Sequence, residues 1–319
     1  MKVWLDGSMS LIEDTNVSCL AHTLYYGTGV FEGIRSYGIE DGHTVFKIRE
    51  HVNRLFNSAH SLRMVIPFSP DEIENGIRMV LAQNELKDAY IRPLVYFEQG
   101  GMGLDVSANP RNPVRTLIAA WKWDSYFSTS KWEDGISARL GDWKRVFPHP
   151  SVSKAKAVGF YASSYMAHME AKSYGFQEAI LIDEYGNLTE ASASNLFLIQ
   201  NETLYTPTTR SILPGITREA VISISRDLGL KVVEDHIPQD QIFIADEVFL
   251  SGTACEIMPV TRINEQKIGS GKAGIVTKLI SDTYQILVRS NNHNPQVYPG
   301  WINHMPDRRR NQKRTSAIL

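Results

Sequence analysis

Apolar residues in this chain change repeatedly between the alternating spacing of strands and the spacing of amphipathic helices, and this change most constrains its fold. The β-prone run from Val30 to Tyr37, for example, is followed by a helical pattern over residues 49–62. Because the same change recurs in the second half, we expect two α/β domains with α+β elements. The length of 319 residues agrees, since it exceeds that of a typical single core.

Local signals predict the boundaries of several elements. Ser69 is expected to cap a helix that has Pro70 in its first position. Asp41-Gly42 is expected to turn the chain within a hairpin, and Gly229 to end a later helix. Strands are expected over residues 3–5, 30–37, 44–48, 89–97, 114–121, 178–182, 196–199, 231–233 and 248–251, and helices over 49–62, 70–81, 157–174, 214–228 and 276–288.

A polar, serine-rich stretch over residues 124–134 predicts the connection between the domains. It contains Tyr126, Phe127 and Trp132, and aromatic loops of this kind often line a site between domains. We therefore expect a small N-terminal domain over 1–123, a larger C-terminal domain over 135–302, and a tail of unknown role over 303–319.

Charge and composition exclude several classes of protein. A formal net charge of −2 argues against nucleic acid as a partner, because phosphate backbones need a concentrated basic face. The basic run over 308–314 is expected to be a solvated tail rather than a nucleic-acid or membrane arm. Neither a signal peptide nor an apolar run of the ~18 residues that span a membrane occurs, so we expect a cytoplasmic protein. Cys19 and Cys255 are expected to be buried free thiols.

Two short patterns resemble known motifs only superficially. In the pattern Gly27-Thr28-Gly29 with Gly33, the third glycine lies one position too far along the chain for a dinucleotide fingerprint, and no clear strand precedes it. The pattern from Ser151 to Lys154 fits that of serine acylases, but the companion triads of that class are missing, so it is a weak alternative. No spacing typical of a metal site occurs, and we expect no metal.

The most informative region carries Lys154 and Lys156 beside small residues. Removing a lysine from water favours its neutral, nucleophilic form, which covalent chemistry on a carbonyl requires. Taken alone, two lysines in a loop are more often solvated surface residues. Glu190, however, follows at the end of a short strand among small residues, where a carboxylate can hold a proton on a pyridinium nitrogen.

Three further features suit a phosphate. Leu213 to Arg218 is a glycine turn that leads into a helix, and helix N-termini bind anions. Ser251 to Ala254 is a second small, polar turn after a strand, and Arg54 offers a bidentate donor. Each is modest alone; together with the lysine and the carboxylate they match what pyridoxal phosphate requires.

These residues bring the chain close to a known family. From about Val3 to Ile302 it resembles the fold-type-IV pyridoxal-phosphate aminotransferases, most closely those acting on branched-chain amino acids. The resemblance implies two domains with the active site at their interface. The segments that carry the resemblance are 26–35, 49–51 with 54–55, 90–94, Lys156 with Tyr161, 213–218, 246–249 and 251–254.

The resemblance also implies roles for single residues. Lys156, spaced five residues from Tyr161, would carry the cofactor covalently and move the proton of the substrate. Tyr161 would bond the phenolic oxygen of the cofactor, and Glu190 its ring nitrogen. The phosphate would be held by Arg54, Thr217, Thr253 and the backbone of Ile216.

A second group would form the substrate pocket. Arg92 would meet the side-chain carboxylate of glutamate or 2-oxoglutarate, so that one pocket accepts apolar and acidic side chains in turn. Phe31, Trp123 and Tyr126 would form the apolar walls of this pocket. The α-carboxylate of the substrate would be bound by Tyr90 and by the backbone of Thr253 and Ala254, and Tyr26 would support these residues.

The implied reaction is transamination of leucine, isoleucine or valine with 2-oxoglutarate in a homo-oligomer whose partner chain completes the pocket. A D-amino acid or R-amine transaminase, an aminodeoxychorismate lyase, and a catalytically silent cofactor-binding protein remain alternatives. Two departures from the family bear on the packing around the site and on the substrate range, but not on the cofactor: residues 191–195 read Ala-Ser-Ala-Ser-Asn, and Phe160 stands where a smaller polar residue is common.

Overall fold

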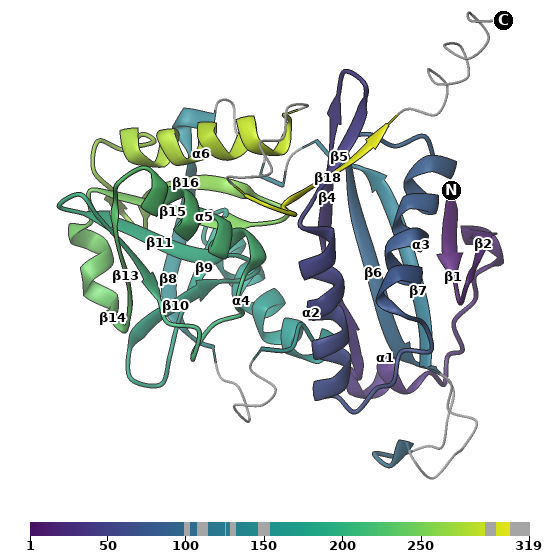
Figure 1. Ribbon diagram of the computed structural model, residues 1–319. Coiled ribbons are helices and arrows are strands. Elements are labelled where there is room, and N and C mark those ends of the chain that lie inside the picture. Colours follow the sequence, from purple (N-terminus) through teal and green to yellow (C-terminus); the bar gives the residue numbers. More distant parts are fainter. Residues whose placement is uncertain are drawn as a thin grey trace, which may run out of the picture.

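The computed structural model describes residues 1–98, 103–106, 114–124, 126–127, 132–145, 154–290 and 298–306. Two β-sheets dominate these residues, each with its own helices (Figure 1). The N-terminal sheet and the helices α2 and α3 lie on the right of the view, and the C-terminal sheet lies on the left. The fold is therefore that of two mixed helix-and-strand domains side by side.

The first sheet is antiparallel, with strand order β18-β5-β4-β6-β7-β1-β2 and β3 paired to β6. Helices α2 and α3 cover it and bury a core that includes Val52, Leu55, Ile73 and Ile77. Its elements are β1 (Lys2–Leu5), β2 (Ser8–Leu11), α1 (His22–Tyr26), β3 (Gly29–Phe31), β4 (Ile34–Ile39), β5 (Gly42–Phe46), α2 (Ile48–Ser61), α3 (Pro70–Gln83), β6 (Ala89–Phe97), β7 (Val114–Lys122) and β18 (Ile302–Pro306).

The expected helix start at Ser69 is confirmed in detail. The Ser69 hydroxyl accepts from the Glu72 amide and the Glu72 carboxylate accepts from the Ser69 amide, which forms a capping box with Pro70 in the first turn. Strands β6 and β7 also agree with the predicted ranges, whereas β5 spans 42–46 rather than the expected 44–48, because α2 already begins at Ile48.

The single strand expected over residues 30–37 is wrong. The chain forms β3 and β4 instead, and Glu32-Gly33 interrupts them. The side chain of Glu32 is fully buried and binds Arg54 and His51 of α2, so the break places a carboxylate against that helix. Strand propensity alone cannot report such a bond.

The second sheet closes on itself. Strand β10 pairs with both β9 and β11, which joins the two ends of the path β11-β15-β16-β8-β9-β10. A barrel-like core of residues such as Leu196, Leu250 and Val260 fills it. Its strands are β8 (Ile136–Lys144), β9 (Glu178–Ile182), β10 (Asn187–Ala191), β11 (Asn195–Gln200), β12 (Thr203–Pro207), β13 (Lys231–Asp235), β14 (Ile237–Pro238), β15 (Glu247–Gly252), β16 (Glu256–Ile263) and β17 (Gln266–Lys267).

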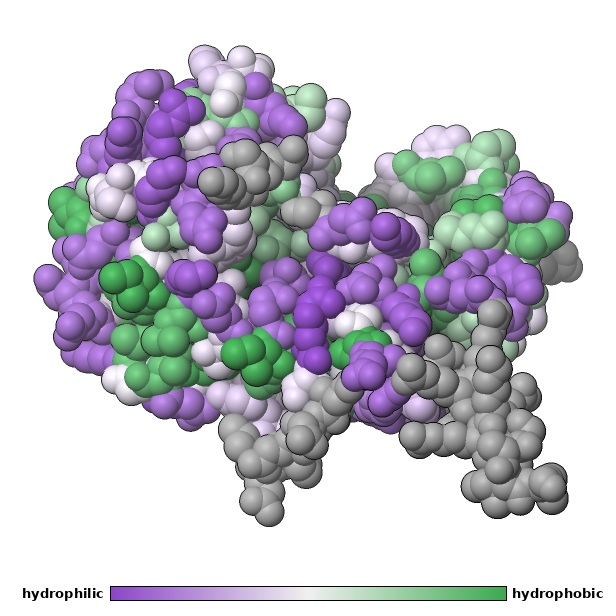
Figure 2. All heavy atoms as spheres, turned by 90° about the horizontal axis from the view of Figure 1, so that it is seen from above, coloured by the Kyte–Doolittle hydropathy of each residue, from purple (hydrophilic) through white to green (hydrophobic). Residues whose placement is uncertain are grey.

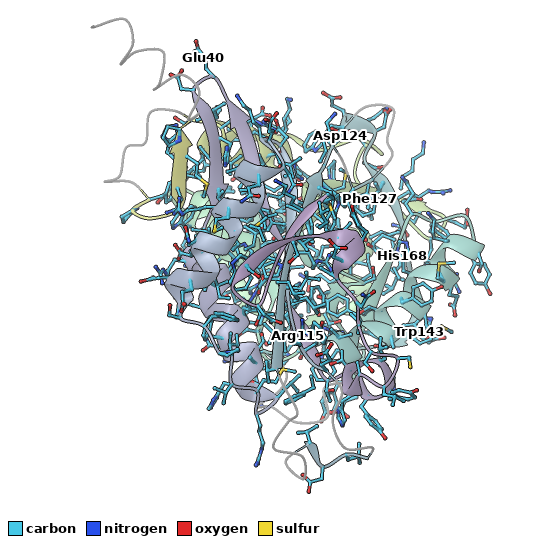
Figure 3. All side chains as sticks on the ribbon, turned by 90° about the vertical axis from the view of Figure 1, so that its right-hand side faces the viewer. Glu40, Arg115, Asp124, Phe127, Trp143 and His168 are labelled. Carbon is cyan, nitrogen blue, oxygen red and sulfur yellow. The ribbon has the colours of Figure 1, made fainter. Side chains whose placement is uncertain are left out.

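Three helices pack on this barrel. Helices α5 (Ile216–Asp227) and α6 (Ile275–Val288) share one core, and α4 (Tyr161–Ser173) packs on β9. His168 of α4 and Trp143 of the facing strand β8 are labelled in Figure 3. Gly229 follows α5 with φ of 82°, so the helix ends where the sequence predicted.

The two domains share buried contacts. Tyr37 of β4 and Tyr284 of α6 are buried, and their hydroxyl oxygens lie 3.1 Å apart. The segment Ile302–Pro306 forms β18, which pairs with β5 of the N-terminal sheet. The sequence did not predict this strand. The first part of the region expected to be a tail of unknown role thus belongs to the N-terminal sheet, while residues 307–319 lie outside the described residues.

Asp124 and Phe127, both labelled in Figure 3, and the short helical turn at Trp132 belong to the stretch expected to connect the domains. Residues 125 and 128–131 are outside the described part, and the predicted boundaries at 124 and 134 remain predictions. On the surface, hydrophobic patches lie among hydrophilic side chains (Figure 2). Among the described residues no helix is long and apolar enough to span a membrane, and no acidic, histidine and cysteine cluster fit for a metal is found.

Candidate active site

A cavity of about 230 Å³ lies between the two domains and is lined by residues from both. Concave sites at domain interfaces that combine aromatic walls with a few charged groups are the usual place for small ligands. The lining consists of Phe31, Gly33, Arg54, Tyr90, Arg92, Trp123, Tyr126, Arg145, Lys156, Tyr161, Glu190, Ser192, Ala193, Ser194, Asn195, Leu213, Gly215, Ile216, Thr217, Ser251, Gly252, Thr253 and Ala254.

Lys156 enters this cavity from a segment tied to the N-terminal domain. Its amide donates to the Ser58 hydroxyl at 3.0 Å, and its carbonyl accepts from the Phe31 amide at 3.1 Å. The neighbouring Ala155 and Ala157 are buried in the N-terminal core, which explains the small residues on both sides of the lysine. The backbone of Lys156 is therefore fixed, and only its side chain extends into the cavity.

The amine of Lys156 donates to the hydroxyl oxygen of Tyr161 at 2.9 Å. Tyr161 opens α4, directly after a short helical turn over Val158–Phe160. The ring of Phe31 meets that of Tyr161 edge-on at 4.8 Å, and the lysine nitrogen lies 5.2 Å from the Phe31 centroid. Two aromatic rings thus hold the amine at the wall of the cavity.

Glu190 lies on the other side of the cavity, at the end of β10, and is 5% exposed. One of its carboxylate oxygens lies 2.8 Å from Nε of Arg145, and the other accepts from the Leu213 amide and the Asn195 side chain. Burial raises the pKa of Glu190, although Arg145 and the Leu213 amide oppose this shift. The carboxylate is thus held by three polar partners at a buried position.

Arg145 is a residue that sequence reasoning missed. It follows β8, no motif surrounds it, and it is 9% exposed, so only its position opposite Glu190 reveals it. Asn195 is a second such residue, because its amide donates both to Glu190 and to the Leu213 carbonyl at 2.9 Å. A Cβ at Gly215 would lie 1.9 Å from the Asn195 side-chain oxygen, which explains the glycine at this turn.

The N-terminus of α5 opens into the same cavity. Its cap residue, Gly215, has no side chain to satisfy the first amides of the helix, and Ile216 and Thr217 follow directly. Such unsatisfied amides at the positive end of a helix bind phosphate. Thr253, in the turn between β15 and β16, and Arg54 of α2 line the cavity at its edges.

Arg54 is held by a buried carboxylate. Its Nε and Nη2 donate to the two oxygens of Glu32 at 2.6 and 2.9 Å, and its Nη1 donates to the Pro214 carbonyl at 2.9 Å. Burial by itself would raise the pKa of Glu32, but the Arg54 charge and the hydrogen bonds from His51 and Arg54 outweigh it. The pKa of Glu32 therefore lies well below its usual range.

This shift makes stability depend on pH. Above the unfolded pKa of about 4.3, Glu32 is ionised in both states and its full contribution is present. As the pH falls below that value, only the unfolded chain takes up the proton, so the free energy of unfolding decreases toward the lower folded pKa. We expect Glu32→Gln to show a smaller loss of unfolding free energy between pH 7 and pH 4 than the unchanged protein in urea titrations. An equal loss in both proteins would contradict this.

One wall of the cavity is aromatic. Tyr90 packs on Trp123 with centroids 4.8 Å apart, and Trp123 on Tyr126 at 6.3 Å. The guanidinium of Arg92 lies over the rings of Phe31 and Tyr90, and its Nη2 donates to the Tyr90 hydroxyl at 3.3 Å. An arginine within an aromatic box can face either an acidic or an apolar side chain.

Gly33 leaves room for this wall. A Cβ at Gly33 would lie 2.0 Å from the Tyr90 hydroxyl oxygen, so Gly33→Ala must displace that hydroxyl. We expect Gly33→Ala to raise KM by about tenfold, equivalent to ~1.4 kcal/mol of binding, with a smaller effect on kcat. Steady-state kinetics test this. Since the effect acts through the Tyr90 hydroxyl, Gly33→Ala should raise KM much less in a Tyr90→Phe background than in the unchanged protein. An equal rise in both backgrounds would mean that the clash lies elsewhere.

Of the residues assigned to the site from the sequence, all but one line the cavity. Tyr26 lies outside the lining, on α1, where it is 41% exposed and its ring lies 4.5 Å from that of His22. Lys154 is exposed and does not line the cavity, whereas Lys156 does. Ser151, the start of the acylase-like pattern, lies outside the described residues.

The other sequence features fall into place around the cavity. Gly27, part of the apparent dinucleotide motif, has φ of 64° and accepts at its carbonyl from the Gly159 amide, so it joins α1 to the turn before α4. Residues 192–195 line the cavity, whereas Phe160 packs against the N-terminal core. Cys19 and Cys255 are both free thiols, but the expected burial holds only for Cys255, since Cys19 is exposed. Burial raises the pKa of Cys255 to about 12.

A lysine amine, a buried carboxylate and a helix N-terminus in one interdomain cavity define a site for a phosphorylated carbonyl cofactor. Comparison with known proteins agrees. Residues 29–263 match the family described as Amino-transferase class IV, and the chain belongs to that family.

Named relatives cover most of the chain. It is 39% identical over 286 residues to a branched-chain-amino-acid aminotransferase from Pseudomonas aeruginosa, which covers 90% of this chain and 92% of the relative. The Escherichia coli K12 enzyme of the same name is 41% identical, covering 88% and 91%. A solved structure of the Escherichia coli enzyme superposes with a TM-score of 0.90 at 38% identity, covering 95% of this chain and 98% of that one.

Proposed function

We propose that this chain transfers the amino group of leucine, isoleucine or valine to 2-oxoglutarate, which yields branched-chain 2-oxo acids and L-glutamate. The observation that carries the proposal is the Lys156 amine beside Tyr161, opposite the buried pair Glu190 and Arg145, in a cavity with aromatic walls. The names of the relatives from Pseudomonas aeruginosa and Escherichia coli support the same activity.

The cofactor is pyridoxal 5'-phosphate, and the residues present fit it. A solved structure of a branched-chain amino acid aminotransferase with pyridoxamine 5'-phosphate is 38% identical to this chain, with a TM-score of 0.88. In this chain Lys156 would bind the carbonyl carbon, Tyr161 the phenolic oxygen and Glu190 the ring nitrogen. The phosphate would be held by Arg54, Thr217, Thr253 and the Ile216 amide, all of which line the cavity.

When bound, this cofactor supplies a carbonyl for linkage to amines and a protonated ring that withdraws electrons from the substrate α-carbon. Lys156 would hold the carbonyl carbon of the cofactor, and its Nζ, once free, would serve as the base beside Tyr161. That nitrogen would take up and hold the proton of the substrate α-carbon. Glu190 would hold the proton of the ring nitrogen, and Arg145, 2.8 Å from Glu190, opposes the protonation of that carboxylate.

Both half-reactions use one substrate pocket. Phe31, Trp123 and Tyr126 would enclose a branched aliphatic side chain, whereas Arg92 would bond the side-chain carboxylate of glutamate. Arg92 already lies over Phe31 and Tyr90, so its charge remains compensated by ring faces when the apolar substrate is bound. Tyr90, with the turn at Thr253 and Ala254, would take the α-carboxylate common to all substrates.

The test is the visible spectrum of the purified protein before and after adding L-leucine. The proposal expects a yellow band that bleaches as the amino group is taken up, and that returns when 2-oxoglutarate is added. A band that responds to D-alanine and not to L-leucine would instead favour a D-amino acid transaminase. Release of pyruvate without a 2-oxo acid acceptor would favour a lyase, and protein that takes up no cofactor would overturn the proposal.

We also propose that the working assembly is a homo-oligomer. Exposed apolar side chains gather on α1 and α4, including Leu24 (64% exposed), Tyr165 (61%) and Met166 (52%). The bond between Gly159 and Gly27 brings the end of α1 to the start of α4, so these side chains can form one surface. Exposed apolar patches of this kind mark association sites, and a second copy would bury it.

We expect Met166→Glu to shift this protein from dimer toward monomer, because an uncompensated carboxylate would be desolvated at the contact. Sedimentation velocity measures the shift. Ile286→Glu is the matched control, since Ile286 on α6 is also exposed (72%) but lies on another helix. A monomeric protein, or equal behaviour of both variants, would contradict the proposed surface. The expected cytoplasmic location remains a prediction.

A further inference from the structure

Glu32 is a fully buried carboxylate that does not line the cavity. Its Oε1 accepts from Nε of Arg54 at 2.6 Å, and its Oε2 accepts from Nη2 of Arg54 at 2.9 Å and from the Gly33 amide at 3.2 Å. The same Oε2 lies 2.8 Å from Nδ1 of His51. Burying a carboxylate costs several kcal/mol unless it is tightly paired, and these bonds provide that pairing.

The bonds fix the plane of the Arg54 guanidinium. Two parallel bonds to one carboxylate leave a guanidinium no freedom to rotate, in contrast to a single contact. Bonds to described residues, including that to the Pro214 carbonyl, use three of its five N–H groups, so one remains on each terminal nitrogen. Pro214 directly precedes the cap residue of α5, so these nitrogens lie beside the helix N-terminus that suits a phosphate.

His51 completes the arrangement. It is 1% exposed, and burial lowers its pKa, so the ring is neutral and its Nδ1 is set to donate to Glu32. Glu32 is thus held from two positions on α2, one turn apart, and cannot follow Arg54 if that side chain moves. The interruption between β3 and β4 places the carboxylate there.

We infer that Glu32 is a positioning residue: it fixes the Arg54 guanidinium at the α5 end of the cavity and thereby sets the preference for phosphorylated over unphosphorylated pyridoxal. The inference rests on the proposed function, because the phosphate belongs to the proposed cofactor. Glu32 acts through Arg54, and its substitution changes phosphate recognition without changing the covalent link at Lys156.

The test measures the dissociation constants of pyridoxal phosphate and of pyridoxal for the apoprotein by quenching of tryptophan fluorescence. The dissociation constant of pyridoxal divided by that of pyridoxal phosphate reports phosphate recognition alone, since both ligands link to Lys156 in the same way. A larger ratio means stronger recognition of the phosphate. We expect Glu32→Gln and Glu32→Asp each to reduce this ratio about tenfold, toward that of Arg54→Gln. Asp keeps the negative charge, so a loss in Glu32→Asp arises from geometry and not from the field at the phosphate.

Two further measurements separate positioning from mere stability. In the double variant Glu32→Gln/Arg54→Gln the ratio should be no lower than in Arg54→Gln alone, because Glu32 acts only through Arg54. The phosphorus-31 resonance of bound cofactor should shift in Glu32→Gln in the same direction as in Arg54→Gln. Glu74→Gln is the matched control: it removes the buried carboxylate of α3 that pairs with Arg49 of α2, outside the cavity lining, and should lower stability while leaving the ratio unchanged.

An unchanged ratio in both Glu32 variants, with folding verified by circular dichroism, would overturn the inference while leaving the proposed function intact. So would losses that add fully in the double variant. If Glu32→Gln fails to fold, Glu32→Asp decides the question. If Arg54→Gln itself leaves the ratio unchanged, the phosphate assignment and the inference both fall.

Discussion

Replacing Lys156 with alanine should abolish the visible band of the bound cofactor and reduce turnover by at least about 10⁴-fold, the upper range for a group that transfers a proton. The side chain is both the covalent attachment and the base, and its amine faces the Tyr161 hydroxyl at 2.9 Å inside the cavity. No other lysine lines the cavity among the described residues, so none is placed to take over.

The variant should still fold. The Lys156 backbone bonds to Ser58 and Phe31 do not involve its side chain, and the buried neighbours Ala155 and Ala157 are unchanged. Lys154→Ala is the matched control, because Lys154 is exposed two residues earlier and should keep the band and the activity. Absorption and single-turnover kinetics measure both variants. A band that survives in Lys156→Ala and disappears in Lys154→Ala would transfer the role to Lys154.

Features that depend on neighbouring residues were predictable from the sequence. The capping box at Ser69 involves residues three positions apart, and the helix end at Gly229 needs only a residue that tolerates a positive φ. The hairpin at Gly42 and the alternating strands β6 and β7 are local in the same sense. In these places the period of the apolar residues and the turn chemistry agree.

Features that depend on residues distant in the sequence could not be predicted from it. The break at Glu32 exists because its carboxylate meets residues 19 and 22 positions away on α2. Strand β18 forms because residues 302–306 pair with the edge strand β5, and the sequence of residues 302–306 does not indicate this distant partner. Both are tertiary effects, and the first of them falls at the proposed site, where local rules are most often broken.

The candidate site shows the same division. Lys156, Glu190 and the turn at Gly215 belong to recognisable local patterns, and the structure brings them into one cavity. Arg145 has no such pattern, because its importance lies in its distance of 2.8 Å from Glu190 across 45 residues of chain. Tyr26 shows the opposite case: a family motif includes it, yet within this single chain it lies outside the cavity lining.

Replacing Glu190 with glutamine should reduce kcat on the order of 10²- to 10³-fold, as the loss of one directed electrostatic contact in an enzyme site does. A neutral amide cannot keep a proton on the ring nitrogen, so electrons from the substrate α-carbon lose their acceptor. The covalent link at Lys156 is separate from this contact, so the visible band should persist while its conversion by L-leucine becomes slow. This combination distinguishes Glu190→Gln from Lys156→Ala.

The same substitution should also cost stability, because it leaves the Arg145 guanidinium buried without its partner carboxylate. Losses of about 3 kcal/mol are typical when one member of a buried ion pair is removed. Glu178→Gln is the matched control: Glu178 is fully buried on β9 of the same barrel, accepts from the Ala179 amide, and does not line the cavity. It should lose stability yet keep kcat.

The comparison of the two variants tests the assignment of Glu190 directly. A common loss of stability with a loss of kcat in Glu190→Gln alone would mean that the carboxylate acts on the cofactor ring. Equal kcat losses in both variants would mean that either substitution disturbs the barrel, and the role of Glu190 would then be structural.

Burial raises the pKa of Glu190, and Arg145 opposes that shift. Arg145→Met should therefore move the acid limb of the pH profile of kcat to higher pH. An unmoved acid limb would show that Arg145 does not control the protonation of Glu190.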